Sequence, residues 1–294
     1  METLSERRFD IARLRGLWAL TKAPQTALLL VTGICTYTLT IGLPFDPVEG
    51  LWMGAALFLS ISGCTALNMY LDRDIDGMMK RTSTRPLPAG RLQPCEALGF
   101  GGTLSLMGLG LSFALDFRFG LVISAGFSLD LLVYTVWLKR VTPLSIVLGG
   151  VSGGMPVLAG RVLALGRFDP VGVLLAASVL LWIPSHILTL AIQYADDYAR
   201  AGVPTWPNVY GPRATRLFIA AANLLNAVLL TSVGWILRVH PVALISLSGL
   251  SLGIFGLSAI QLASPSAQRN WVLFKAASLY MLASCLLLTV GSLT

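Results

Sequence analysis

Long apolar stretches dominate this chain and leave it few choices of fold. Charge-free runs fall at 23–45, 50–71, 97–115, 141–160, 170–195, 217–237, 239–268 and 276–294, and a ninth run, 119–138, is interrupted only by Asp130. A transmembrane helix needs about 20 apolar residues, and charged residues make up only 12% of the chain, about half of what soluble domains carry. Because a chain in lipid must satisfy its own backbone hydrogen bonds, we expect an all-α integral membrane protein with nine transmembrane helices in a single bundle around a central cavity.

The basic residues predict how this bundle is oriented. With an odd number of spans and the N-terminus inside, 17 of the 21 lysines and arginines fall in inner segments and four in outer ones. Positive residues concentrate on the cytoplasmic side of membrane proteins. We therefore expect a cytoplasmic N-terminal arm (1–22), a C-terminus outside, and one domain over 1–294 in the cell (inner) membrane. This distribution also explains the net charge of +7, so no nucleic-acid partner is indicated.

The segment 68–76, Asn-Met-Tyr-Leu-Asp-Arg-Asp-Ile-Asp, carries the clearest chemical signal. Asn68, Asp72 and Asp76 are spaced four residues apart, so they form one ridge on a helix. Carboxylates at the end of a membrane span cost free energy, and spanning a bilayer does not require them. Carboxylate and amide oxygens suit Mg²⁺, which in phosphate enzymes is held by a few such groups together with substrate phosphates. The ridge predicts a metal-diphosphate site, with Asp74 off the ridge.

A second inner loop repeats part of this pattern. Gln193 precedes Asp197 by four residues, as Asn68 precedes Asp72, and Asp196 lies beside Asp197. We expect two active-site loops, 72–94 and 194–214, to face each other and enclose the diphosphate. The predicted metal ligands are Asn68, Asp72, Asp76, Asp196 and Asp197, with Asp72, Asp76 and Asp197 as the catalytic acids. Basic residues near these loops are candidates for binding phosphate; they are Lys80, Arg81, Arg85, Lys139 and Arg140.

The acidic ridge resembles the first motif of the UbiA family of intramembrane prenyltransferases. Four segments resemble the protohaem IX farnesyltransferase (haem O synthase) branch of that family: 68–91, 134–156, 182–186 and 196–204. They include Tyr-Thr-Val-Trp-Leu-Lys-Arg-Val-Thr-Pro from Tyr134 and Asp-Asp-Tyr-Ala-Arg-Ala-Gly-Val-Pro from Asp196. The chain departs from the pattern at Ser185, at 22–25, where Lys-Ala-Pro-Gln replaces Lys-Pro-Arg, and at Asp130, which has no expected counterpart.

The resemblance implies a reaction in which the farnesyl group of farnesyl diphosphate is transferred to a vinyl group of haem B, giving haem O. It implies Mg²⁺ as cofactor, with haem B as a substrate, membrane lipid around the protein, and a haem A synthase or terminal oxidase downstream. Tyr134, His186 and Tyr198 join the substrate-binding residues on the same ground. His186 is an ionisable group inside an apolar span, where a functional role is expected; the alternatives are contact with the porphyrin, an iron ligand, or a structural hydrogen bond.

Two other functions have to be weighed. Another UbiA-type prenyltransferase, acting on an aromatic, lipid or chlorophyll-like acceptor, would share the metal residues without needing His186. A transporter would carry acids deep in several spans, whereas only Asp130 is deep in this sequence. Four glycines at 149, 150, 153 and 154 indicate close helix packing or a cavity wall that admits a flat ligand.

Overall fold

The computed structural model describes the backbone of residues 4–294 and the side chains from residue 11 onward, so the side chains of Arg7 and Arg8 in the basic arm lie outside it. The described chain is helical, without a β-strand. Its elements are α1 (Leu4–Leu20), α2 (Ala23–Ile41), α3 (Pro47–Leu71), α4 (Arg73–Met78), α5 (Pro94–Leu115), α6 (Phe117–Ser128), η1 (Leu129–Trp137), η2 (Leu138–Arg140), α7 (Ser145–Gly149), α8 (Val151–Leu165), α9 (Pro170–Ile183), η3 (Pro184–Leu188), α10 (Thr189–Gln193), α11 (Ala195–Arg200), α12 (Trp206–Ile236), α13 (Pro241–Ala263) and α14 (Ala267–Leu293).

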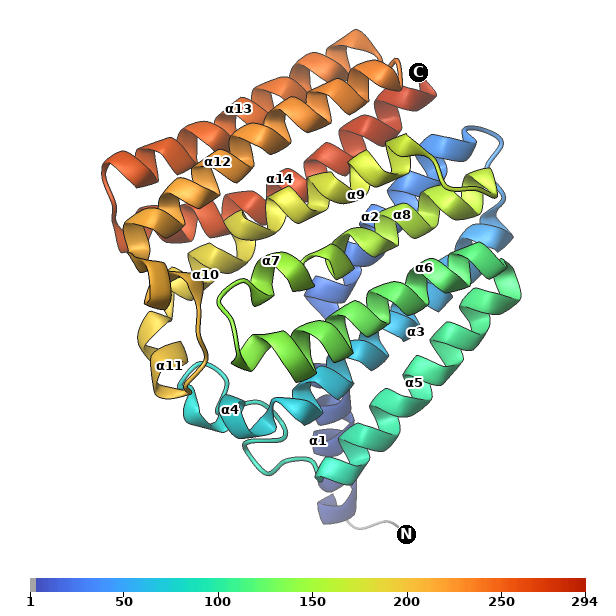
Figure 1. The fold of residues 1–294 in the computed structure, drawn as a ribbon. Helices are drawn as coiled ribbons and strands as arrows, with labels where there is room; N and C mark the ends of the chain where they lie inside the picture. The colour runs from blue at the N-terminus through green and yellow to red at the C-terminus, as the bar shows by residue number, and fades with distance from the viewer. Residues whose placement is uncertain (1–3) are drawn as a thin grey trace.

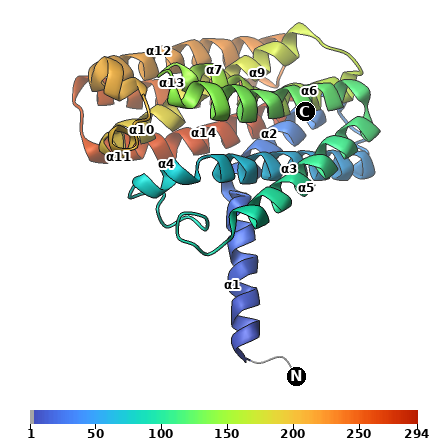
Figure 2. The ribbon, with the colours of Figure 1, turned by 60° about the horizontal axis from the view of Figure 1, so that its bottom comes forward.

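Within residues 4–294, nine helical segments are long and apolar enough to cross a membrane, which confirms the predicted number. Three of them are composite: α6 continues through η1 and η2, α7 through α8, and α9 through η3 and α10. The nine segments form one bundle, while α1 projects away from it (Figures 1 and 2). The loop between α3 and α5 and the loop between α10 and α12 lie at the same end of the bundle (Figure 1).

The seventh and ninth spans begin earlier than the apolar runs predict. Helix α12 starts at Trp206, with Pro207 in its first turn, and bends at Gly211, where φ is 82°. Helix α14 starts at Ala267 after Ser266, whose side chain accepts a hydrogen bond from the Arg269 amide. Both helices therefore extend past the apolar run as amphipathic turns, which hydropathy alone misses. The second predicted loop, 194–214, consequently contains α11 and the first turns of α12.

Acidic caps begin several spans at the end of the bundle opposite the two loops. Asp46, Asp116 and Asp169 each accept a hydrogen bond from a backbone amide in the first turn of α3, α6 and α9 respectively. Such caps satisfy amides that have no partner within the helix. These acids are therefore explained by helix formation.

Small residues allow the helices to pack closely. A Cβ atom added to Gly160 of α8 would lie 2.3 Å from the Gly33 carbonyl oxygen of α2, and one added to Gly154 would lie 2.6 Å from the Ala176 carbonyl of α9. Small residues serve this purpose in membrane bundles, so close packing is confirmed at Gly154. The space beside Gly149 is taken up by the ring of Tyr134.

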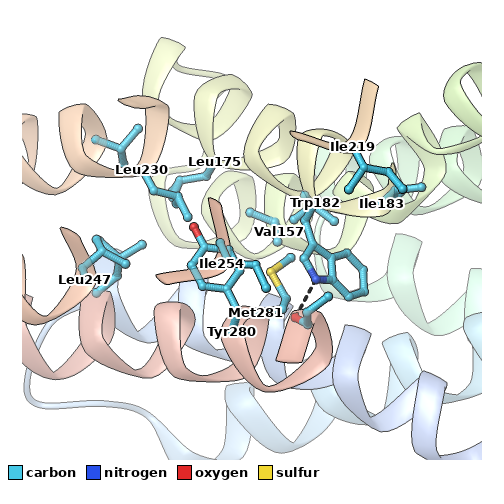
Figure 3. Packing of buried hydrophobic residues seen from close by; sticks show 14 of the residues in the cluster. Val157, Leu175, Trp182, Ile183, Ile219, Leu230, Leu247, Ile254, Tyr280 and Met281 are labelled. Carbon is cyan, nitrogen blue, oxygen red and sulfur yellow. Dashed lines mark hydrogen bonds between the residues drawn. The ribbon is translucent and has the colours of Figure 1, made fainter. Parts of the chain in front are cut away.

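Two apolar clusters hold the bundle together. One joins α2, α3, α6 and α8, and the other joins α9, α12, α13 and α14. In the second cluster the Trp182 indole donates a 2.7 Å hydrogen bond to the Ala277 carbonyl, fixing α9 against α14 (Figure 3). A small apolar cavity lies beside this cluster, lined among others by Cys35, Leu175 and Cys285. The polar groups described next lie apart from these clusters.

Candidate active site at the ends of the third and eleventh helices

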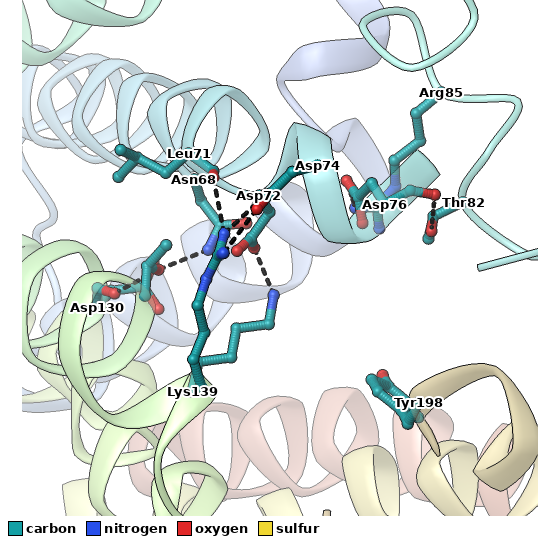
Figure 4. Close-up of polar contacts among 12 residues, drawn as sticks. Asn68, Leu71, Asp72, Asp74, Asp76, Thr82, Arg85, Asp130, Lys139 and Tyr198 are labelled. Atoms are coloured by element: carbon teal, nitrogen blue, oxygen red, sulfur yellow. Dashed lines mark hydrogen bonds and ion pairs between the residues drawn. The ribbon is translucent and has the colours of Figure 1, made fainter. Parts of the chain in front are cut away.

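The last two turns of α3 face the end of the fourth span. Asn68 donates a 2.6 Å hydrogen bond from Nδ2 to Thr135 Oγ1, and its Oδ1 accepts from Lys22 Nζ at 3.4 Å. Asp72 is fully buried and its Oδ2 pairs with Lys139 Nζ (Figure 4). The other oxygen, Asp72 Oδ1, is buried without a hydrogen-bond partner. Burial raises the pKa of Asp72, while Lys139 opposes this shift.

The third member of the predicted ridge, Asp76, lies on the short helix α4. It is also buried, and its Oδ2 accepts a hydrogen bond from Arg85 Nη1 at 2.5 Å. Thr82 donates to the Asp76 carbonyl at 2.9 Å. The loop after α4 therefore folds back so that Arg85 reaches the acid nine residues before it.

Asp74 points away from this interior. Its side chain is 54% exposed and accepts two hydrogen bonds from Arg140, at 2.6 and 2.7 Å. These hydrogen bonds lower the pKa of Asp74 to about 2. Arg140 also donates to the Leu71 carbonyl. The structure thus places Arg140 on the exposed side of the motif, where it ties the fourth span to α3, and places Lys139 on the buried side.

The second acidic loop meets the first through Asp197. Asp197 is buried, pairs with Arg200, and accepts a 3.2 Å hydrogen bond from the Arg81 backbone amide. Arg81 also donates to the Tyr198 hydroxyl at 3.4 Å. Asp196, by contrast, is exposed, and it makes no hydrogen bond or ion pair to any residue that the structure describes. Of the two neighbouring acids, Asp197 is therefore the one that faces the first loop.

Apolar contacts support this meeting of the loops. Ile75 and Met79 from the first loop pack with Ala201 and Val203 from the second, and Tyr198 packs against them. In Figure 4, Lys139, Asp76 and Tyr198 stand around one space between the loops. The expectation that 72–94 and 194–214 face each other is confirmed.

The side chains fit a divalent cation that also binds a phosphate. Over residues 11–294, no three His, Cys, Asp or Glu side chains converge into a preassembled metal cluster. The predicted ligands instead form separate half-sites, each with one or two carboxylates. Mg²⁺ is commonly held by one or two carboxylates plus substrate phosphates, and the unpartnered Oδ1 of Asp72 is an acceptor available for such a contact. Three of the five predicted ligands, Asp72, Asp76 and Asp197, are at present balanced by cations of the chain.

The remaining predicted substrate-binding residues differ in their positions. Lys80 is exposed, and its side chain makes no hydrogen bond to any described residue. Tyr134 lies against Gly149, with Lys139 Nζ 5.8 Å from its ring centroid. A Cβ on residue 149 would come within 2.6 Å of that ring, so the glycine makes room for Tyr134.

His186 lies between two aromatic rings. The Trp182 ring is 5.0 Å away and the Phe274 ring 4.8 Å away, both stacked nearly parallel to it, and Nδ1 is 3.2 Å from Ser278 Oγ. Both faces of the imidazole are therefore covered. Only its edge, with Nε2, can be offered to a ligand.

Sequence reasoning missed Lys22 and Thr135. Lys22 has a left-handed backbone, with φ of 47°, which is uncommon for a residue other than glycine and is often found at functional sites. Burial, followed by the neighbouring Arg85, lowers the pKa of Lys22 to about 8. The only sequence signal was the likeness of 22–25 to a basic motif, which placed Lys22 in the arm and gave it no role.

Comparison with known proteins agrees with this geometry. The model of the UbiA prenyltransferase family matches residues 28–285. A protein from Archaeoglobus fulgidus named protoheme IX farnesyltransferase is 39% identical over 91% of this chain and 94% of its own length. Another protein of that name, from Korarchaeum cryptofilum, is 48% identical over 74% of this chain and 73% of its own length.

Solved structures share the fold at lower identity. A digeranylgeranylglyceryl phosphate synthase superposes with a TM-score of 0.77 at 20% identity, over 96% of this chain and 99% of that one. A UbiA homologue from Archaeoglobus fulgidus, bound to GPP and Mg²⁺, superposes with a TM-score of 0.69 at 15% identity, over 95% and 99% of the two chains. At such identities the likeness establishes the fold.

Proposed function

Because this chain belongs to the UbiA prenyltransferase family, and within it to the protohaem IX farnesyltransferases, we propose that it transfers the farnesyl group of farnesyl diphosphate to a vinyl group of haem B. The products are haem O and diphosphate. The observation that carries this proposal is the 39% identity to a protein of that name across nine-tenths of the chain. The facing acidic loops support it, since they supply the groups that a metal-diphosphate needs.

The first loop and the end of the fourth span would hold the diphosphate. Lys139 and Arg85 currently neutralise Asp72 and Asp76. A bound metal would take over that role, and both cations would then be free to contact phosphate oxygens. Lys22 contacts Asn68, and the backbone amide of Arg81 contacts Asp197, so both residues would add further positive charge to the site. Arginine binds phosphate oxygens in pairs, which suits Arg81 and Arg85.

The bound Mg²⁺ would neutralise the negative charge that builds on the diphosphate as the allylic C–O bond breaks. Its proposed ligands are Asn68, Asp72, Asp76, Asp196 and Asp197. The protein's own contribution is to orient these acids and to balance their charge. Lys139 does so for Asp72, Arg85 for Asp76 and Arg200 for Asp197.

The surrounding bundle would keep water from the allylic cation until the new carbon bond forms. The reacting end of the prenyl chain would lie on the bundle side of Asp72, near Tyr134, whose ring centroid is 5.8 Å from Lys139 Nζ. A haem acceptor would approach His186 at the edge of its ring, because both ring faces are covered by Trp182 and Phe274. From the positive-inside distribution we propose that the site lies at the cytoplasmic face of the cell (inner) membrane.

Mass spectrometry of extracted porphyrins tests the function. Purified protein would be incubated with haem B, farnesyl diphosphate and Mg²⁺, and in parallel with EDTA. The expected product is heavier than haem B by one farnesyl group plus one water, and EDTA should abolish it. Folded protein that binds the diphosphate but gives no such product would refute haem as the acceptor.

A pair of Asp→Asn variants controls this assay. Asp72→Asn should lower transfer by about 10³-fold, because it removes a carboxylate from the proposed metal site. Asp116→Asn should retain transfer, since Asp116 caps α6 far from the site and asparagine caps a helix as well as aspartate does. Equal losses in both variants would argue against a special role for Asp72.

A further inference from the structure

Asp130 is an acid inside a span that neither helix formation nor the diphosphate site explains. The acids at 46, 116 and 169 cap helices, Glu49 pairs with Tyr37 and Glu96 with Arg13, and those at 72–76 and 196–197 belong to the two loops. Asp130 stands alone within the membrane span Phe117–Arg140. An ionisable group at such depth is costly and by default functional.

The π-helical segment η1 turns Asp130 toward α3. Two η1 side chains and Lys139 of the following η2 contact one ridge of α3 and its C-cap: Asp130 contacts Cys64, Thr135 contacts Asn68, and Lys139 contacts Asp72. Cys64 and Asp72 are eight residues apart, whereas their partners Asp130 and Lys139 are nine residues apart. Nine residues make about two turns of a π-helix, which has more residues per turn than an α-helix. In an α-helix nine residues make two and a half turns. Asp130 and Lys139 would then point in opposite directions.

Residues on the other side of η1 face outward. Leu132, Val136 and Trp137 are 56–64% exposed and lie on the lipid side, whereas Asp130 is half-buried. One carboxylate oxygen, Oδ2, accepts from Cys64 Sγ at 3.2 Å. The other, Oδ1, accepts no hydrogen bond from any residue that the structure describes. Asp130 Oδ1 is therefore free to accept a hydrogen bond from a water molecule or a ligand.

The depth of Asp130 can be read along α3. Its partner Cys64 precedes Asp72 by eight residues, which is about 12 Å of helix. The reacting carbon of the prenyl chain is bonded directly to the diphosphate. The new C–C bond joins it to the terminal vinyl carbon, and the cation forms on the next carbon, two carbons farther from the phosphate. Asp130 lies farther into the bundle than Asp72, on the side of the diphosphate where the cationic carbon would be.

We propose that Asp130 is a catalytic base that holds and deprotonates the water which captures the acceptor cation. This inference rests on the proposed haem farnesylation. Cys64, Thr135 and Asn68 lie beside Asp130 as polar groups within an otherwise apolar bundle, and a buried water needs two to four such partners.

The electrons and protons balance in this step. The vinyl π-electrons form the C–C bond to the allylic carbon and leave a cation on the vinyl carbon next to the porphyrin ring. A lone pair of the water oxygen forms the C–O bond, one O–H bond breaks, and its electrons stay on oxygen. The proton goes to Asp130 Oδ1 and afterwards to the departing diphosphate. The product carries the hydroxyethylfarnesyl group.

The test is the product made by Asp130→Asn in H₂¹⁸O with haem B, farnesyl diphosphate and Mg²⁺. Asparagine keeps the shape but cannot take the proton. General bases typically contribute 10²–10⁴-fold, so we expect the hydroxylated product to fall by about 10²-fold. A second product, lighter by one water, should appear as the cation instead loses a neighbouring proton. Asp130→Glu should restore part of the ¹⁸O-labelled product.

Each outcome decides the matter. Asp130→Asn that makes labelled haem O at the wild-type rate would overturn the inference, and so would an equal fall in all products with an unchanged ratio. If Asp130→Asn is poorly folded, as shown by lost binding of farnesyl diphosphate, the product ratio of Asp130→Ala is decisive: an unchanged ratio overturns the proposal. Wild-type protein that makes no prenylated haem would refute the proposed function, a result distinct from the others.

Discussion

The ion pair between Asp72 and Lys139 should contribute strongly to stability as well as to activity. Asp72 is 1% exposed and Lys139 13% exposed at the side chain, so water screens the pair little. Lys139→Met would leave the Asp72 carboxylate without its cation, while its second oxygen already has no partner. Breaking a buried pair from one side costs about 3–5 kcal/mol. In a chain of this size that is a fall in Tm of about 5–8 °C.

A double-mutant cycle isolates the interaction. Asp72→Asn should destabilise for the complementary reason, since it leaves a buried ammonium group without a counter-charge. The double variant, Asp72→Asn with Lys139→Met, removes both charges and should be more stable than Lys139→Met alone. We expect a coupling free energy of about 3 kcal/mol, measured by thermal unfolding in lipid nanodiscs. Additivity within about 0.5 kcal/mol would refute the conclusion that the two groups neutralise each other.

Three further predictions concern other parts of the molecule. The rate of prenyl transfer should decline as pH rises through about 8, where Lys22 loses the proton that makes it a phosphate-binding cation. The pH–rate profile of Lys22→Arg should lack this decline below pH 10. An unchanged profile would exclude Lys22 as the group responsible. Gly160→Ala should lower the free energy of unfolding by about 1–3 kcal/mol, because its Cβ would meet the Gly33 carbonyl at 2.3 Å, whereas Gly110→Ala, with nothing within 4 Å, should be neutral or stabilising in the same thermal assay. His186→Phe should keep Tm within about 2 °C by preserving the aromatic stack, yet weaken haem B binding in a spectroscopic titration; unchanged haem affinity would make the residue structural.

The sequence was sufficient for features that depend on local composition. Apolar runs give the nine spans because lipid allows a spanning chain little but helix, and the four-residue spacing of Asn68, Asp72 and Asp76 predicts a shared face wherever the backbone is helical. The resemblance to UbiA prenyltransferases could likewise be recognised from short sequence motifs, and the family match confirms it. Boundaries were less accurate where helices extend as amphipathic turns beyond the apolar run, as at Trp206 and Ala267.

Pairing between distant groups depended on the tertiary structure. Arg140 and Lys139 are neighbours in sequence with the same charge, yet one binds exposed Asp74 and the other buried Asp72. Asp196 and Asp197 divide in the same way, one exposed and one facing Arg81. Neighbouring residues on a helix point about 100° apart, so the burial of each depends on the position of the opposite element, which sequence spacing does not report.

The winding of the fourth span illustrates the limit most clearly. By itself, the sequence determined a membrane bundle, its acidic loops and the type of chemistry, because hydropathy and charge act locally and can be read residue by residue. Only the tertiary structure decided that Leu129–Trp137 winds as a π-helix, which brings Asp130, Thr135 and Lys139 onto the side facing α3. The physical reason is that the less regular backbone of this segment is compensated by contacts with the end of α3. These are hydrogen bonds to Cys64 and Asn68 and an ion pair with Asp72, and they form only once α3 is in place.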